Sequence, residues 1–244
     1  MEKIDSVLTR RRFLWTTSLA ATFFTVRGAF AEQLARETAW VTEGPFYPPK
    51  LPLDTDNDLI IVNDSITPAV GTIAHVSGRL LDHKGDPIRN AEIEIWQADT
   101  TQTYLAERDR KTKYDANFQG FGRFLTGSTG EYYFRTIKPV PYPGRPAPHI
   151  HFKIKQKGNE PWTTQLYIKG YPGNAQDGIY GGIGDENAKA TVTMDFVPLA
   201  GSTIGELATR FDITPGAAHH EDHHGPPPGG DFGGGDFPPG PPSR

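Results

Sequence analysis

The sequence predicts an all-β fold, an antiparallel β-sandwich with long loops and one short helix near its C-terminal end. Three observations predict this fold: short β-branched and aromatic segments, turn signals between them, and the near absence of helical periodicity. Gly- and Pro-containing turns at 84–87, 128–130 and 171–173 separate the segments. Residues 204–210 have the one helical pattern, so we expect the helix there. The expected strands are 72–81, 91–97, 132–137, 149–155, 164–169 and 191–197.

The two ends of the chain differ from the middle. A run of three arginines, Arg10–Arg12, precedes a short apolar run and the small-residue triplet Ala29–Ala31. This pattern predicts an export signal of the twin-arginine type over residues 1–31, leading to the periplasm or outside, with an N-terminal membrane anchor as the alternative. From 216 to 244 a His-rich run leads into Gly and Pro, which predicts a disordered tail. The β-sandwich domain is therefore expected over residues 32–215.

The composition excludes several classes of function. The chain of 244 residues has no cysteine, so disulfides, thiolate metal sites and cysteine nucleophiles are ruled out. Any metal would be bound through nitrogen or oxygen. The net charge of −4 comes from interspersed acids and bases, which indicates no nucleic-acid partner. Once the signal is removed, we expect no membrane association either.

The pair His149-Ile150-His151 is the most informative chemical feature. On a strand, residues i and i+2 project from one face, so both imidazoles can bind one ion. Just upstream, four prolines between 141 and 148 make a stiff loop that would hold Tyr142 and Arg145 near the histidines. Taken alone, such a pair is more often two ordinary surface or core histidines than a metal site.

Six further motifs follow one another along the chain. They are TEGPFYP at 42–48, IWQAD at 95–99, NFQGFGR at 117–123, TIKP at 136–139, RPAPHIHF at 145–152 and TQLY at 164–167. Together they resemble, in order, the intradiol ring-cleavage dioxygenases, the family of protocatechuate and catechol dioxygenases. The resemblance implies an enzyme that uses O₂ to open a catechol-type ring between its two hydroxyl-bearing carbons. The implied product is a muconate-type diacid.

The resemblance also implies a non-haem ferric iron, Fe³⁺, as the cofactor. In the family Tyr142 would take a proton from the incoming substrate, Arg145 would stabilise charge developing on the ring, and Gln165 would orient the substrate. Trp96 would be a nearby packing wall. Arg145 lies four residues before the first histidine, where the common family pattern has three. The implied iron ligands are Tyr104, Tyr142, His149 and His151.

Two other functions stay open at this point. The segment 77–95 also resembles transthyretin-like and adhesin sandwich domains, which would make the chain a non-catalytic secreted binding module. The histidines at 219–224 suggest a metal scavenger instead. The His-x-His pair together with Tyr142 favours the enzyme, because a plain adhesin has no use for them. The Pro-rich arm at 44–52 is long enough to cross onto a neighbouring subunit, which would make a homo-oligomer.

Overall fold

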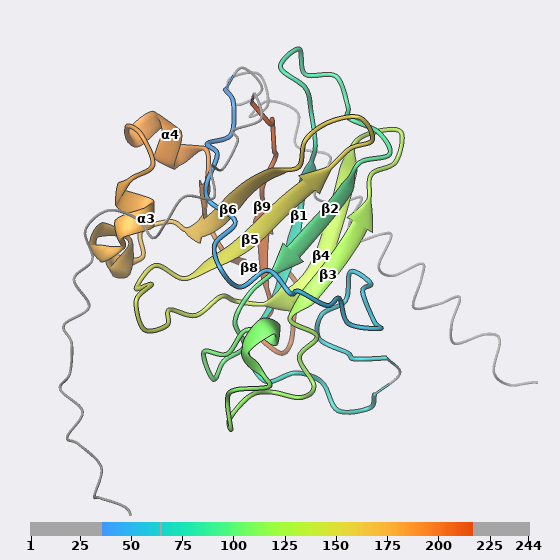
Figure 1. Ribbon diagram of the computed structural model, residues 1–244, viewed down its shortest axis with the longest axis vertical. Coiled ribbons are helices and arrows are strands. Elements are labelled where there is room, and N and C mark those ends of the chain that lie inside the picture. The colour runs from blue at the N-terminus through green and yellow to red at the C-terminus, as the bar shows by residue number, and fades with distance from the viewer. Residues whose placement is uncertain (1–35, 64, 217–244) are drawn as a thin grey trace, which may run out of the picture.

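The computed structural model describes residues 36–63 and 65–216, which form two β-sheets with one shared core (Figure 1). The expected signal at 1–31 and, apart from Gly216, the expected tail lie outside the described residues. No described helix is long and apolar enough to cross a membrane. The all-β sandwich that the sequence predicts is confirmed.

The first sheet has four strands in the order β4-β1-β9-β8. Strand β1 pairs antiparallel with β4 and parallel with β9, so the sheet is mixed rather than purely antiparallel. The helix predicted at 204–210 is wrong, because residues 207–210 form strand β9. The pairing with β1 outweighs the weak local preference of this short segment. The bounds are β1 (Ile73–Arg79), β4 (Glu131–Ile137), β8 (Val197–Pro198) and β9 (Leu207–Arg210).

The second sheet has five strands in the order β3-β2-β5-β6-β7. Its pairs are antiparallel except β6 with β7. The single strand expected at 191–197 is two short strands, β7 and β8, which belong to different sheets. Strand β3 has no counterpart among the expected strands. The bounds are β2 (Glu92–Trp96), β3 (Phe121–Leu125), β5 (His149–Lys155), β6 (Trp162–Ile168) and β7 (Thr193–Met194).

Strand alternation decides which side chains fill the core. On β5, Ile150 and Phe152 point inward and are fully buried against Phe134 of the other sheet. Burial of each such side chain stabilises the fold by about 1.5–3 kcal/mol. The alternate positions, His149 and His151, therefore project from the outer face of the five-stranded sheet. The core thus fixes the face on which both histidines lie.

The helices are short and lie in the connections. Figure 1 shows α3 and α4 beside the end of β6. Their bounds are Gly178–Gly181 for α3 and Glu186–Ala190 for α4. Two 3₁₀ turns, η1 (Leu105–Glu107) and η2 (Pro172–Gln176), complete the described helical elements.

The segment 42–52, which contains the Pro-rich arm at 44–52, runs across the outer face of the five-stranded sheet (Figure 1, blue). Its Thr42 carbonyl accepts a hydrogen bond from Gln165 Nε2 at 2.9 Å, and its Tyr47 hydroxyl donates to Glu94 Oε2 at 2.8 Å. The arm therefore covers the same face that carries the two histidines, and it does so on its own chain.

Candidate metal centre

Strand register places aromatic and polar residues around the two histidines. His151 lies opposite Trp96 on β2 and opposite Gln165 on β6. The Trp96 indole stacks on the His151 ring, with centroids 4.7 Å apart and planes 11° apart. His149 lies opposite Tyr167 on β6. The packing wall expected at Trp96 therefore holds the plane of the second imidazole.

A tight turn positions Tyr142 and Arg145. The Arg145 N–H donates to the Tyr142 carbonyl at 2.9 Å, and the Tyr142 N–H donates to the Arg145 carbonyl at 3.1 Å. Pro143 and Gly144 occupy the central positions, and Gly144 has φ +87°. Proline followed by glycine at positive φ is the signature of a type II turn, where a residue with a Cβ would be strained. The stiff loop thus carries Tyr142 to the histidines, with its ring 5.6 Å from that of His149.

Tyr104 reaches the site from the loop after β2, and Asp99 organises that loop. The buried Asp99 carboxylate accepts hydrogen bonds from the N–H groups of Thr101 at 2.8 Å, Thr103 at 3.1 Å and Asp115 at 2.7 Å. Sequence reasoning missed Asp99. An Asp followed by short polar residues is a signal for such side-chain-to-backbone turns and was the available clue.

Four side chains converge on one point. Tyr104 Oη lies 3.2 Å from His149 Nε2, 3.1 Å from His151 Nε2 and 3.4 Å from Tyr142 Oη. Tyr104 and both histidines are almost fully buried. The structure therefore brings together all four residues that the sequence predicts as ligands, although they come from a loop, a turn and a strand.

The spacing of these donor atoms fits a single cation. Atoms that each bind one ion at about 2 Å, roughly at right angles, lie about 3 Å from one another. Within residues 36–63 and 65–216, no three His, Cys, Asp or Glu side chains form a group that could hold a metal ion. A metal at this point would therefore need the tyrosine oxygens. Phenolate oxygen is a hard, anionic donor that suits a highly charged ion better than a soft one.

Burial keeps both imidazoles neutral. It lowers the pKa of His149 to about 3, helped by the nearby Arg145 guanidinium. Burial, His149 and Arg145 lower the pKa of His151 as well. His149 Nδ1 donates to the Ala147 carbonyl at 2.7 Å, which leaves a lone pair on Nε2. His151 Nδ1 is buried and has no hydrogen-bond partner, so stacking on Trp96 and the contact of Nε2 with Tyr104 Oη orient this ring.

The two tyrosines are phenols in the absence of a cation. Burial, followed by the neighbouring Tyr142, raises the pKa of Tyr104 well above its ordinary value, and burial raises the pKa of Tyr142. Such groups ionise near neutral pH only if a strong positive charge compensates. The donor set thus has two neutral nitrogens and two oxygens that become anionic when a cation binds.

The residues predicted around the ligands lie beside them. Arg145 is buried and donates from Nη2 to Gln165 Oε1 at 2.9 Å and to Tyr167 Oη at 3.1 Å. Burial disfavours its charge, but Tyr167 and Asp177 outweigh burial and raise the pKa of Arg145. Gln165 is bonded at both ends of its amide, since its Nε2 donates to the Thr42 carbonyl. Gln165 therefore holds Arg145 and the arm.

Phe46 was not selected from the sequence, although it lies in the quoted TEGPFYP motif. Its ring stacks on Tyr104, with centroids 4.5 Å apart and planes 11° apart, and meets the edge of Tyr142 at 6.0 Å. Phe46 thus packs the arm against both tyrosines. Nothing in the motif other than its aromatic character could have indicated this contact.

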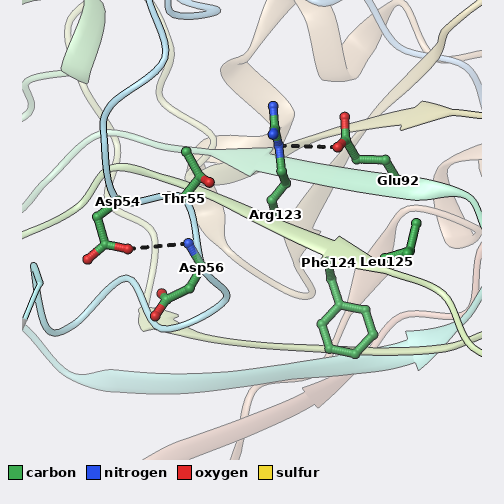
Figure 2. A pocket seen from close by; sticks show the side chains of 7 residues that line it. All are labelled: Asp54, Thr55, Asp56, Glu92, Arg123, Phe124 and Leu125. Atoms are coloured by element: carbon green, nitrogen blue, oxygen red, sulfur yellow. Dashed lines mark hydrogen bonds and ion pairs between the residues drawn. The ribbon is translucent and has the colours of Figure 1, made fainter.

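A separate cleft of about 400 Å³ opens at the other end of β2 and β3 (Figure 2). None of the predicted ligands lines it. Its one cation, Arg123, is already paired with Glu92 at 3.3 Å and with the buried Glu94 at 3.1 Å. The cleft is lined by Asp54, Thr55, Asp56, Glu92, Arg123, Phe124 and Leu125.

Comparison with known proteins agrees with the fold. The family model described as Dioxygenase matches residues 42–213. The chain therefore belongs to the intradiol ring-cleavage dioxygenase family. A solved structure, the dioxygenase domain of a dioxygenase carbohydrate-binding protein fusion from the cellulolytic bacterium Streptomyces sp. SirexAA-E, is 28% identical. It superposes with a TM-score of 0.57 and covers 75% of this chain and 100% of its own.

Two curated relatives are similar over shorter stretches. The protocatechuate 3,4-dioxygenase beta chain of Burkholderia cepacia is 39% identical over 115 residues, 44% of this chain and 49% of its own length. The hydroxyquinol 1,2-dioxygenase of Corynebacterium glutamicum is 28% identical over 200 residues, 71% of this chain and 62% of its own length. The chain thus spans about half to two thirds of the length of these relatives.

Proposed function

We propose that this chain is a non-haem ferric dioxygenase that opens a catechol-type ring with O₂ between the two hydroxyl-bearing carbons. One observation carries the proposal: Tyr104 Oη, Tyr142 Oη, His149 Nε2 and His151 Nε2 meet at one point. Family membership supports it, because relatives include dioxygenases named for protocatechuate, catechol and hydroxyquinol.

The four converging residues would hold the iron. When bound, Fe³⁺ would supply Lewis acidity and a template for the two oxygens of a catechol. A trivalent charge favours the ionised form of both tyrosines. Tyr142 lies at the start of the turn and is less buried than Tyr104. Its Oη is therefore the atom that would accept a proton from a substrate hydroxyl.

Arg145 would act on the substrate as a fixed positive charge. The guanidinium is buried, so its field is weakly screened, and the same turn that holds Tyr142 holds it beside the iron ligands. Negative charge that develops on the ring during cleavage would be stabilised there. Gln165 would contribute by fixing the guanidinium.

A product analysis tests the proposed function. The purified protein is incubated with protocatechuate, catechol or hydroxyquinol, and O₂ consumption is measured together with the product mass. The expected product contains the substrate plus both atoms of one O₂ and has a new carboxyl group at each of the two carbons that carried the hydroxyls. An aldehyde product from cleavage beside the diol, or O₂-independent binding without turnover, would contradict the proposal.

A deletion variant distinguishes the enzyme from the two alternatives, a metal scavenger and a non-catalytic binding module. Deletion of residues 217–244 removes the His-rich run, and an enzyme keeps its iron and activity without it. A metal scavenger loses its metal. A binding module retains catechols but releases them unchanged.

Export remains a proposal that rests on residues 1–31, which lie outside the described residues. Replacement of Arg11 and Arg12 by lysine should keep the protein in the cytoplasm, because the twin-arginine route requires the paired arginines. Cell fractionation of both forms checks this, and unchanged export of the variant would contradict it.

A further inference from the structure

Arg145 is held by side chains that lie outside the strand carrying the histidines. Its Nε donates to Asp177 Oδ2 at 2.8 Å, while its Nη2 donates to Gln165 Oε1 and Tyr167 Oη. A guanidinium is planar, so bonds from Nε and Nη2 to fixed partners define the orientation of the whole group. Asp177 lies far along the chain from the RPAPHIHF motif and was not selected from the sequence.

The two oxygens of the Asp177 carboxylate have different tasks. Oδ1 accepts hydrogen bonds from the N–H groups of Ile179 at 3.1 Å and Tyr180 at 2.9 Å, and so caps α3. Oδ2 accepts from Arg145 Nε and from the Ala147 N–H at 3.3 Å. Asp177 is 2% exposed, and its side chain is fully buried. One buried carboxylate thus ties α3 to the loop that leads into His149.

Close packing keeps this carboxylate in place. A Cβ on Gly173 would lie 2.1 Å from the Pro146 carbonyl oxygen, so only glycine permits η2 to approach the loop at this point. Asn174 Nδ2 donates to the Ile168 carbonyl at 2.8 Å and fixes η2 to the end of β6. The segment that leads into Asp177 is therefore anchored both to the loop and to β6.

We propose that Asp177 is a positioning residue for the ring-cleavage reaction and acts through Arg145. It fixes the guanidinium against Gln165 and Tyr167, beside Tyr142 and His149. The inference rests on the proposed function of the site.

The test compares two helix-capping aspartates. Asp177→Asn is nearly isosteric, but its amide cannot offer oxygen both to α3 and to the N–H donors of Arg145 and Ala147. The matched control is Asp185→Asn, because Asp185 caps α4 through the Ala188 N–H at 2.9 Å and, within the described part of the chain, bonds to no predicted site residue. We expect Asp177→Asn to lower kcat about 10–100-fold with KM and iron content little changed. Asp185→Asn should leave kcat unchanged.

A double-mutant cycle decides whether Asp177 acts through Arg145. If it does, Asp177→Asn lowers kcat in the wild-type background but causes no further loss in an Arg145→Ala background. Additive losses would overturn the proposal, as would equal losses in Asp177→Asn and Asp185→Asn. If Asp177→Asn fails to fold, Asp177→Ser replaces it, because serine retains a capping oxygen and cannot reach Arg145.

The urea midpoint of the full chain supplies a readout that does not need turnover. If Asp177 and Arg145 are coupled, Asp177→Asn destabilises the wild type more than it destabilises the Arg145→Ala variant, which already lacks the guanidinium. A wild-type protein that cleaves no catechol would defeat the proposed function. In that case the urea cycle still judges the contact, and additive shifts of the midpoint would overturn the inference.

Discussion

The outer faces of the two sheets each carry buried histidine, and the surroundings of these histidines differ. On the four-stranded sheet, His75 has both ring nitrogens engaged, Nδ1 with Tyr133 Oη at 2.5 Å and Nε2 with Glu206 Oε1 at 3.1 Å. On the five-stranded sheet, His151 Nδ1 has no partner, and Nε2 shares the Tyr104 hydroxyl with His149. A histidine next to a tyrosine is therefore not by itself a metal site.

The difference lies in how the polar groups are satisfied. Around His75, tyrosine and glutamate complete a closed set of hydrogen bonds, which accounts for burial of the ring. Around His149 and His151, two phenols and two imidazoles gather with no carboxylate among the contacts on Tyr104 Oη. A cation between the four donor atoms would bind their lone pairs, whereas His151 Nδ1 would stay without a partner.

The largest effect is expected from loss of an imidazole. His151→Ala or His149→Ala should remove the iron. The loss of activity should exceed the ~10–100-fold typical for loss of a residue that only hydrogen-bonds to a metal ligand. His75→Ala should retain the iron while losing stability, since Tyr133 and Glu206 are left without a partner. Iron per chain and ring-cleavage rate are measured for all three. The comparison fails if His75→Ala loses as much iron as His151→Ala.

The next effect is expected at the tyrosines. Tyr104→Phe deletes the oxygen on which the other three donors converge. We expect at least ~10-fold weaker iron binding and a weaker visible absorption band from tyrosinate-to-Fe³⁺ charge transfer. Tyr133→Phe deletes only the hydrogen bond to His75 and should cost about 1 kcal/mol of stability with the band unchanged. Iron titration followed by absorbance checks both. Equal iron affinity in the two variants would contradict the assignment of Tyr104.

The smallest effect is expected where the arm covers the outer face of the five-stranded sheet. Tyr47→Phe removes the hydrogen bond to the fully buried Glu94, which Lys155 and Arg123 also contact. A hydrogen bond to a charged group contributes about 1.5–3 kcal/mol, so the urea midpoint should fall while iron remains bound. An unchanged midpoint together with lost iron would show that the arm belongs to the metal centre and not only to its cover.

Most of the fold could be predicted because alternating apolar residues reveal strands. The segment 149–155 is a strand with the predicted bounds, and its inward residues form the core. Strand β9 could not be predicted, since residues 207–210 are too few to show a period and depend on pairing with β1. The interval 191–197 read as one strand because local pattern cannot show that its two ends join different sheets.

The candidate site divides in the same way. Strand geometry predicts that His149 and His151 share a face, and the loop stiffened by proline and glycine predicts Tyr142 near them. Their roles as ligands come from the family resemblance. Tyr104 entered only through the family resemblance, because its loop is polar and its place depends on Asp99. Asp177 could not be predicted, because no pattern in the local sequence indicates its contact with Arg145.

The central claim is most directly tested by the visible absorption spectrum of the purified protein together with its iron content. The account predicts close to one iron per chain and a broad visible band from tyrosinate-to-Fe³⁺ charge transfer, which shifts when a catechol is added without O₂. A folded protein that stays colourless and iron-free after ferric and ferrous salts are supplied would contradict it.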